Sequence, residues 1–382
     1  MRAWNCIAGN QKIQPIGMDI GHNSLKMVQL AVAEDRIKVV AARRMPLDVD
    51  QVCDGQERDQ AVVSAVRRLL ADNQFRGRQV ISALPIDRLK ITSLRLSEGE
   101  MPQANKILRK EAAERFGLDP EKDAINYIHA GSVRQGDVVK DEYILFAADG
   151  ETITGHIRVL EEAGLTPVSI DAPPCALFRS FERTMRRQED RERTVIFIDV
   201  GHRFTTVVFG RSSEICFVKQ IPVAMGRFTE EVASTLGIAV ADAESLRLRL
   251  LQDEPVDAAT RRPVIDALNV MAEQLAGEIS LCLRYYTVTF RGKRVERAIV
   301  AGGGAYEQVL RDALRRHLSV EVEIAEPLRG FDLGEGGIDD SYGTGFADLA
   351  LAVGLSLKGW GACASSNMPA TGLEPVLEGE SL

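Results

Sequence analysis

The stretch Ile16-Gly-Met-Asp-Ile-Gly-His-Asn-Ser-Leu-Lys-Met-Val-Gln-Leu-Ala-Val32 predicts two paired strands joined by a tight turn. Apolar residues alternate with other residues on both sides of the turn, as in strands that have one buried face. Asp19 lies near the end of the first strand, and Gly21 opens the turn. Because glycine lets the backbone bend with its N–H groups toward an anion, such a turn can hold phosphate while the carboxylate faces a magnesium ion through water.

The same pattern returns in the second half of the chain. Val195-Ile-Phe-Ile-Asp199-Val-Gly-His is again a buried strand that enters a glycine turn, and residues 205–209 form the expected return strand. The segments DIGHNSLK and DVGHRFTT align without a gap and share Asp, Gly and His. One Asp-x-Gly turn is common hairpin chemistry. Two of them after buried strands indicate a duplicated fold unit with a phosphate loop in each half.

A third glycine-rich turn, Gly302-Gly303-Gly304, lies between a predicted strand at residues 297–301 and a predicted helix that contains Val309. Glycines at this place let an adenosine approach the backbone closely. The turn does not fit the Rossmann pattern G-x-G-x-x-G, and the chain has no G-x-x-x-x-G-K-[ST] phosphate loop. A nucleotide would therefore be held between two hairpin loops and not at one helix N-terminus.

The composition excludes several classes of function. The chain has 382 residues, 45% of them hydrophobic, which is enough for two or three folded units. With 47 basic and 55 acidic residues the net charge is -8, so nothing favours binding to nucleic acid or to an anionic membrane surface. The six cysteines include no C-x-x-C pair, which argues against a disulfide framework or a zinc site. Without a signal peptide or an apolar stretch of spanning length, we expect a cytoplasmic protein without direct membrane insertion.

The segment between the two Asp-x-Gly turns predicts that the first domain is interrupted by a smaller inserted subdomain. A βαββ order at residues 89–148 is consistent with an inserted subdomain made of a small open sheet with a helix on one face. An almost entirely charged or polar run at residues 183–193 predicts the join between the two halves. The expected strands lie at residues 37–42, 79–84, 89–96, 124–130, 142–148 and 167–170, and the expected helices at 58–73, 102–116, 152–163 and 175–185.

The second half predicts several helices and a tail. From Trp360 onward Gly, Ser, Pro and acidic residues predominate, which predicts disorder. The expected helices lie at 227–236, 239–251, 262–287 and 346–357, with a strand at 320–324. The expected domains are a first domain of residues 1–85 and 151–190, an insert at 86–150, a second domain at 191–360 with a helical subdomain at about 227–292, a closing helix at 346–357 that packs back on the first domain, and a disordered tail at 361–382.

Several motifs together resemble one family. They are Gly17-Met-Asp-Ile-Gly with Ser24-Leu-Lys26-Met-Val-Gln-Leu, Ala224-Met-Gly226 with Phe228-Thr229, Ala243-Glu244-Ser-Leu-Arg247, and the closing Ala350-Leu-Ala-Val-Gly-Leu-Ser-Leu-Lys. From about residue 16 to 359 the chain resembles the PilM family of type IV pilus assembly proteins, which are relatives of the division protein FtsA. The resemblance implies an α/β, actin-like (ribonuclease H-like) duplicated fold. In that fold, two domains surround a nucleotide cleft, and a small FtsA-like α+β subdomain is inserted in the first.

The resemblance also implies a site for ATP and magnesium. Asp19 and Asp199 would face the magnesium ion through water. Two departures from the family pattern are the histidines of the loops, where small residues are usual, and Met225, which replaces the first glycine of a pair. These larger side chains would crowd the γ-phosphate, so we expect at most a slow ATPase and assign no catalytic residue. The implied ligands are Asp19, Gly21, His22, Asn23, Ser24 and Lys26 in the first loop, Asp199, Gly201 and Thr205 in the second, Gly226 at the phosphates, Glu244 and Arg247 at the adenosine, and Gly302, Gly303 and Gly304 at the sugar and base.

The insert is the implied docking site for a partner. In PilM-like proteins this subdomain binds a short N-terminal peptide of the inner-membrane protein PilN. A groove between the helix that carries Ile107, Leu108, Ala112 and Phe116 and its sheet would supply apolar pockets for an extended peptide. The resemblance thus implies a cytoplasmic ATP-binding adaptor of a pilus or secretion machine. Binding to its partner would hold it at the inner membrane, where it would also contact other components of the pilus or secretion platform. Whether it forms homo-oligomers is left open.

Other interpretations remain open from the sequence. A small-molecule kinase of the same superfamily would need an acid in the cleft as general base. An FtsA-like filament protein would need an amphipathic basic tail, whereas residues 365–382 contain no Lys or Arg. Lys26 could be a solvated strand residue, Glu244 and Arg247 a surface ion pair, and the two loop histidines exposed and inert.

Overall fold

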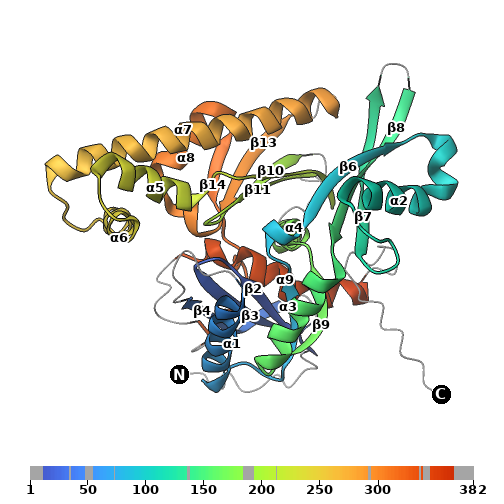
Figure 1. Ribbon diagram of the computed structural model, residues 1–382, viewed down its shortest axis with the longest axis horizontal. Helices are drawn as coiled ribbons and strands as arrows, with labels where there is room; N and C mark the ends of the chain where they lie inside the picture. The colour runs from blue at the N-terminus through green and yellow to red at the C-terminus, as the bar shows by residue number, and fades with distance from the viewer. Residues whose placement is uncertain are drawn as a thin grey trace, which may run out of the picture.

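The computed structural model describes residues 12–33, 36–47, 55–72, 74–135, 138–183, 193–211, 213–290, 294–334, 337–338 and 345–364. The strands of these residues form a six-stranded, a five-stranded and a three-stranded sheet (Figure 1). Among the same residues, no helix combines the length and the apolar character needed to cross a bilayer.

The six-stranded sheet contains the hairpin with the first Asp-x-Gly turn. Its order is β1-β3-β2-β5-β9, with β4 paired to β3. Helices α1 and α3 contact each other and its strands, and α9 contacts β2, β3 and β5. The strands are β1 (Lys12–Ile13), β2 (Ile16–Ile20), β3 (Ser24–Ala33), β4 (Arg36–Pro46), β5 (Gln79–Ala83) and β9 (Thr166–Asp171), and the helices are α1 (Gln56–Ala71), α3 (Gly150–Glu162), α4 (Pro173–Glu182) and α9 (Ala350–Ala364).

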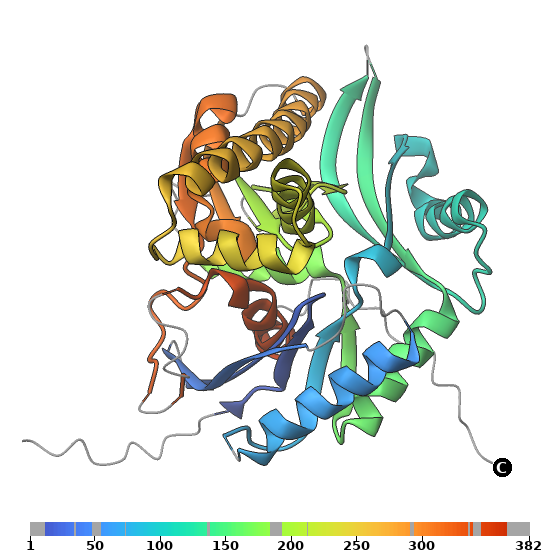
Figure 2. The same ribbon diagram turned by 60° about the vertical axis from the view of Figure 1, so that its left-hand side comes forward.

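The five-stranded sheet carries the second Asp-x-Gly turn. Its order is β12-β11-β10-β13-β14, and the long helix α7 packs against α5 and α8 (Figure 2). Strand β12 was not predicted from the sequence. The strands are β10 (Thr194–Val200), β11 (Thr205–Arg211), β12 (Glu214–Ile221), β13 (Val295–Ala301) and β14 (Glu321–Ile324), and the helices are α5 (Met225–Leu236), α6 (Val240–Leu251), α7 (Ala258–Thr289) and α8 (Gln308–Leu318).

The two larger sheets share the same order of strand directions. Starting from β4, the path β4-β3-β2-β5-β9 is antiparallel twice and then parallel twice. Starting from β12, the path β12-β11-β10-β13-β14 has the same sequence of directions. In each copy the Asp-x-Gly turn joins the central strand to its antiparallel neighbour. The duplicated fold unit predicted from the two aligned segments is therefore confirmed.

The insert has its own sheet and core. Strand β6 (Lys90–Leu96) pairs with β8 (Val138–Ala148), which pairs with β7 (Ala124–Gln135), and α2 (Ala104–Phe116) contacts all three strands. The βαββ order is as predicted. The helix begins at Ala104 and not at residue 102, because a 3-10 turn with a capping box precedes it. Leu96, Leu108, Ala112, Ile125 and Leu145 are among the residues of its core.

Helix α9 closes the fold against the first sheet. It packs on α4 and β2. A Cβ on Gly354 would lie 1.8 Å from the Ala176 carbonyl oxygen, so the two helices touch backbone to backbone. The helix ends at Ala364 and not at residue 357, which corrects the predicted start of the tail at residue 361. Gly359 packs closely on the start of the chain, since a Cβ on it would lie 3.1 Å from Pro15 Cδ.

The remaining predictions for the tail and for the join between the halves concern mostly residues that the structure does not describe. Residues 365–382 of the predicted disordered tail and residues 184–192 of the predicted join between the halves are not described. The domain limits, including the helical subdomain at about 227–292, remain a proposal.

Candidate functional site

The first Asp-x-Gly turn is built around an ion pair. Asp19 and Lys26 are opposite each other in the β2–β3 hairpin, and Lys26 Nζ lies 3.4 Å from Asp19 Oδ2. The Gly21 N–H donates to the Ser24 carbonyl oxygen at 3.0 Å. A Cβ on Gly21 would lie 2.9 Å from Lys26 Nζ, so glycine makes room for the ammonium group above the turn. Lys26 is half-buried and paired, which rules out the solvated-strand interpretation.

The second turn repeats this geometry without the lysine. The Gly201 N–H donates to the Phe204 carbonyl oxygen at 3.1 Å. Thr205 is fully buried, and its hydroxyl donates to the Val223 carbonyl oxygen at 2.7 Å. That hydroxyl therefore connects β11 to the segment that leads into α5. Thr205, one of the implied nucleotide ligands, thus uses its hydroxyl in a hydrogen bond within the protein.

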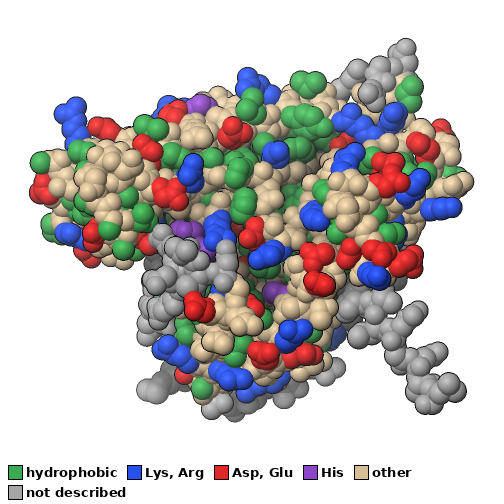
Figure 3. All heavy atoms as spheres, viewed as in Figure 1, with side chains coloured by type: hydrophobic (Ala, Val, Ile, Leu, Met, Phe, Trp, Pro, Cys, Tyr) green, Lys and Arg blue, Asp and Glu red, His purple; other side chains and the backbone are tan. Residues whose placement is uncertain are grey.

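The two turns touch each other. The imidazole rings of His22 and His202 stack with centroids 4.8 Å apart and planes 11° apart. Asn23 Nδ2 donates a hydrogen bond to His202 Nδ1 at 3.0 Å. Figure 3 shows histidine side chains at the hollow between the upper part of the molecule and the part that carries α1. His22 and His202 are half-buried and in contact with each other, so the interpretation of them as exposed loop residues is wrong.

Two carboxylates converge behind this contact. Burial and, to a lesser degree, the charge of Asp19 raise the pKa of Asp199 to about 7, while Lys26 opposes the shift. Among the residues that the structure describes, no group of three or more His, Cys, Asp and Glu could hold a metal ion directly. A pair of carboxylates beside one ammonium group suits a hydrated magnesium ion better than a transition metal, which prefers a closed set of protein ligands.

Backbone hydrogen bonds connect the start of α5 to the second Asp-x-Gly turn. The Met225 N–H donates to the Gly201 carbonyl oxygen at 3.0 Å, and the Gly226 N–H donates to the His202 carbonyl oxygen at 2.8 Å. A Cβ on Gly226 would lie 3.1 Å from His202 Nε2. Glycine at this position therefore admits the His202 ring, and two of the N–H groups at the helix start are already used. The Gly226 amide is not free for a phosphate in this state.

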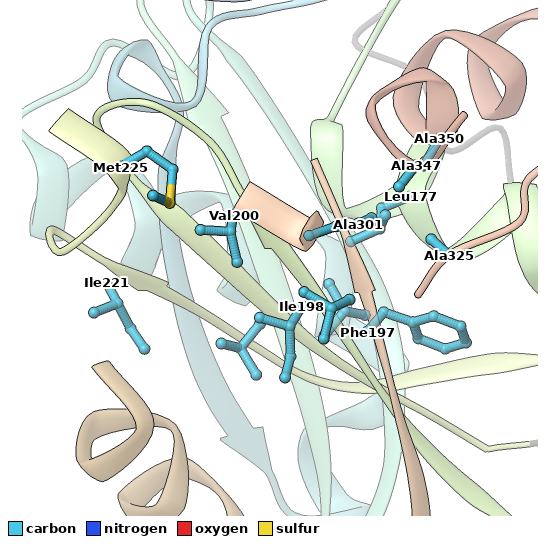
Figure 4. Close-up of a cluster of buried hydrophobic side chains, with 14 of the residues drawn as sticks. Leu177, Phe197, Ile198, Val200, Ile221, Met225, Ala301, Ala325, Ala347 and Ala350 are labelled. Carbon is cyan, nitrogen blue, oxygen red and sulfur yellow. The ribbon is translucent and has the colours of Figure 1, made fainter. Parts of the chain in front are cut away.

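The triple glycine divides into two packed residues and one open residue. Gly302 has φ +83°, and a Cβ on it would lie 2.5 Å from Asp199 Oδ1. A Cβ on Gly304 would lie 2.5 Å from Val200 Cγ1 and 2.7 Å from Met225 Sδ, two side chains that Figure 4 shows near each other. Gly303 is exposed, and a Cβ on it would meet nothing within 4 Å. Of these three glycines, Gly303 is the one that leaves space for a ligand.

Arg247 lies inside the protein beside this turn. Its NH1 group is 3.4 Å from Glu307 Oε2, and the Arg247 side chain is 10% exposed. Its partner is Glu307, at the end of the glycine-rich turn. The interpretation of Arg247 and Glu244 as a surface ion pair is therefore wrong. Glu244 itself is partly exposed on α6. The buried Nε of Arg247 has no hydrogen-bond partner, and a ligand oxygen would satisfy it.

Three further residues complete the site and were not predicted. Arg58 of α1 donates to the His22 and Gly21 carbonyl oxygens at 3.0 and 2.8 Å and so fixes the first turn. Asp348 is buried beside the triple glycine, pairs with Arg44 at 3.0 Å, and leaves its Oδ1 without a partner. Glu307 is the third. Arg58 and Asp348 reach the site from distant parts of the chain, and Glu307 directly follows the glycine-rich turn but belongs to no nucleotide motif.

Comparison with known proteins agrees with this geometry. The family described as "Type IV pilus assembly protein PilM" matches residues 17–360. A solved "PilM-PilN type IV pilus biogenesis complex" is similar with a TM-score of 0.73 and 21% identity, covering 91% of this chain and 98% of that one. The ethanolamine utilization protein EutJ from Carboxydothermus hydrogenoformans is similar with a TM-score of 0.53 and 16% identity, covering 91% and 89%. The search of curated proteins found no match.

These similarities establish the fold and the family. The match to the PilM family spans most of the sequence, including both Asp-x-Gly turns, the insert and the start of α9. The solved PilM structure shares the overall arrangement over nearly the whole of both chains. The fold is therefore actin-like, and the chain belongs to the PilM family of type IV pilus assembly proteins.

Proposed function

We propose that this protein is a nucleotide-binding adaptor of a type IV pilus or related secretion machine. The observation that carries the proposal is the meeting of the two Asp-x-Gly turns, which brings Asp19, Asp199 and Lys26 to one place although the aspartates are far apart in sequence. Two duplicated turns that face each other can enclose a chain of phosphates from both sides. A purely structural contact would not require two partly buried carboxylates near each other, because their charges repel and that arrangement is costly without a cation.

The residues present fit ATP with magnesium. Asp19 and Asp199 would hold the hydrated ion, and Lys26 would bind phosphate oxygens. The partnerless Arg247 Nε and the open face of Gly303 mark where the adenosine would lie, with Glu244 at its rim. The nucleotide would supply phosphate charge that holds the two halves together. With the loop histidines in the way of the terminal phosphate, hydrolysis would be slow, so binding and domain closure are the proposed output.

The insert is the proposed docking site for the cytoplasmic N-terminal peptide of a PilN-like inner-membrane protein. The expected groove between helix and sheet needs correction, because Leu108 and Ala112 are 0% and 1% exposed and fill that interface. Ile107 and Phe116 are partly exposed at its margin, and Arg115 donates to Thr92 Oγ1 at 2.6 Å. We propose that the peptide binds along this margin, which would keep the protein cytoplasmic and peripheral to the inner membrane.

Calorimetric titration of the full chain with such a peptide, with and without ATP and magnesium, tests the docking proposal. Phe116→Glu should weaken binding at least tenfold, because it places a charge on an apolar margin. Val270→Glu is the matched control, since Val270 is 58% exposed on α7, outside the insert, and should not change the affinity. Equal affinity of wild type and Phe116→Glu would refute docking at this margin.

One observation favours the kinase alternative. Burial and Asp19 bring the pKa of Asp199 to about 7, which suits a general base at neutral pH. A kinase would transfer the terminal phosphate to a small hydroxyl compound faster than it hydrolyses ATP, and Asp199→Asn would abolish the transfer. Phosphate release without transfer to any of a panel of metabolites would favour the adaptor.

A further inference from the structure

The contact between His22 and His202 is held from both sides. Arg58 fixes the backbone of His22 through hydrogen bonds to the His22 and Gly21 carbonyl oxygens. The start of α5 fixes His202, because Gly226 donates to its carbonyl oxygen and lies close against its ring. Each imidazole is thus anchored to its own half of the molecule. The stack between them joins the two halves directly.

The hydrogen bond from Asn23 defines the state of the second ring. Asn23 Nδ2 donates to His202 Nδ1, so Nδ1 carries no proton and the neutral ring carries its proton on Nε2. The two rings lie 4.8 Å apart with nearly parallel planes, so their faces are in stacking contact. The contact therefore holds without any ligand, and it occupies the space where the two turns come together.

In the proposed nucleotide site the two Asp-x-Gly turns would enclose the phosphates, so a third phosphate would have to enter this space. The tips of the turns carry His22, Asn23 and His202, which contact each other there. A diphosphate reaches less far between the turns than a triphosphate does. The histidine contact therefore opposes the triphosphate more than the diphosphate.

We propose that His22 and His202, with Asn23, form a latch that closes the two halves on each other without nucleotide and selects nucleoside diphosphate over triphosphate. The selectivity rests on the proposed nucleotide site, whereas the latch itself does not. To bind, a triphosphate would have to break the histidine stack and the Asn23 hydrogen bond, and this lowers its affinity. That cost corresponds to about a tenfold difference in affinity, or about 1.4 kcal/mol.

Two measurements on the full chain test the latch. The first is the ratio of the ATP and ADP dissociation constants, both with magnesium, in wild type, His202→Ala, Asn23→Ala and the control His317→Ala. His317 is a surface residue paired with Glu273 on α7. The second is the distance between spin labels placed through an unnatural amino acid at Ser64 on α1 and Ser245 on α6, which are both exposed. The labels leave the native cysteines untouched.

We expect His202→Ala to lower the ATP-to-ADP ratio of dissociation constants about tenfold and to broaden the nucleotide-free distance distribution toward longer values. Asn23→Ala, which removes one hydrogen bond and keeps both rings, should give a smaller change in the same direction, and His317→Ala none. A ratio unchanged within about twofold overturns the selectivity. An unchanged distance distribution in both variants overturns the latch. If wild type binds neither nucleotide, the nucleotide site and the selectivity fail, and the distances alone decide the latch.

Discussion

Arg247 and Glu307 form a buried ion pair that joins α6 to the end of the glycine-rich turn, with Arg247 NH1 3.4 Å from Glu307 Oε2. Burial raises the pKa of Glu307, and the neighbouring guanidinium opposes that shift. The pair therefore places a carboxyl group and a guanidinium side by side inside the protein, next to the proposed adenosine site. Removing one member leaves the other unpaired in a place of low polarity.

Arg247→Ala should lower the free energy of unfolding by about 3 kcal/mol, because the Glu307 carboxylate loses its partner. The double variant Arg247→Met with Glu307→Gln should recover a large part of that loss, since it removes both charges. Chemical denaturation at neutral pH measures both. A single variant that loses less than about 1 kcal/mol, as a surface pair would, contradicts the burial argument.

Gly354→Ala should destabilise the packing of α9 on α4. The added methyl group would lie 1.8 Å from the Ala176 carbonyl oxygen, so the helices must separate, at a cost of about 2 kcal/mol or more. Gly277→Ala in α7 is the matched control. A Cβ there meets nothing within 4 Å, so the gain in helix propensity should stabilise that variant by up to about 1 kcal/mol. Thermal unfolding of both variants separates the two effects, and equal melting temperatures would show that α9 does not pack as described.

His156 should make stability depend on pH. Its Nε2 lies 3.1 Å from Ser82 Oγ, which donates to the Met18 carbonyl oxygen, and burial lowers the pKa of His156 from 6.5 to about 4. Between these pH values the unfolded chain binds a proton that the folded protein does not, so stability is full above pH 6.5 and falls as the pH drops toward 4. The loss attributable to this residue should reach about 3 kcal/mol.

The variant His156→Gln isolates that contribution. The difference in unfolding free energy between wild type and variant should be constant above pH 6.5 and should shrink as the pH falls toward 4. Denaturation curves at a series of pH values give this difference. A difference that stays constant over the whole range would mean that His156 titrates normally in the folded protein.

Much of this architecture is predictable because it depends on local patterns. Alternating apolar residues and glycine turns mark β2, β3, β10 and β11, and the aligned segments at Asp19 and Asp199 predict the duplication that the strand directions confirm. Periodic apolar residues likewise predict α7, although it begins at Ala258 and not at residue 262. These features need no knowledge of distant contacts.

Other features depend on contacts that no local pattern contains. The close packing of Gly359 in α9 on Pro15 joins residues that are far apart in sequence. Arg58 and Asp348 enter the site from a helix and a turn that carry no nucleotide motif. The stacking of His22 on His202 is a relation between two loops, so the sequence predicts that both histidines are unusual but not that they touch.

Binding of ATP and ADP with magnesium, measured by calorimetry on wild type, Asp19→Ala and Asp199→Ala, tests the central claim most directly. Both aspartates lie where the two turns converge, so we predict that wild type binds at least one nucleotide and that each variant loses at least about a hundredfold in affinity. A wild-type protein that binds neither nucleotide at millimolar concentration, or variants that bind as tightly as wild type, would contradict the account.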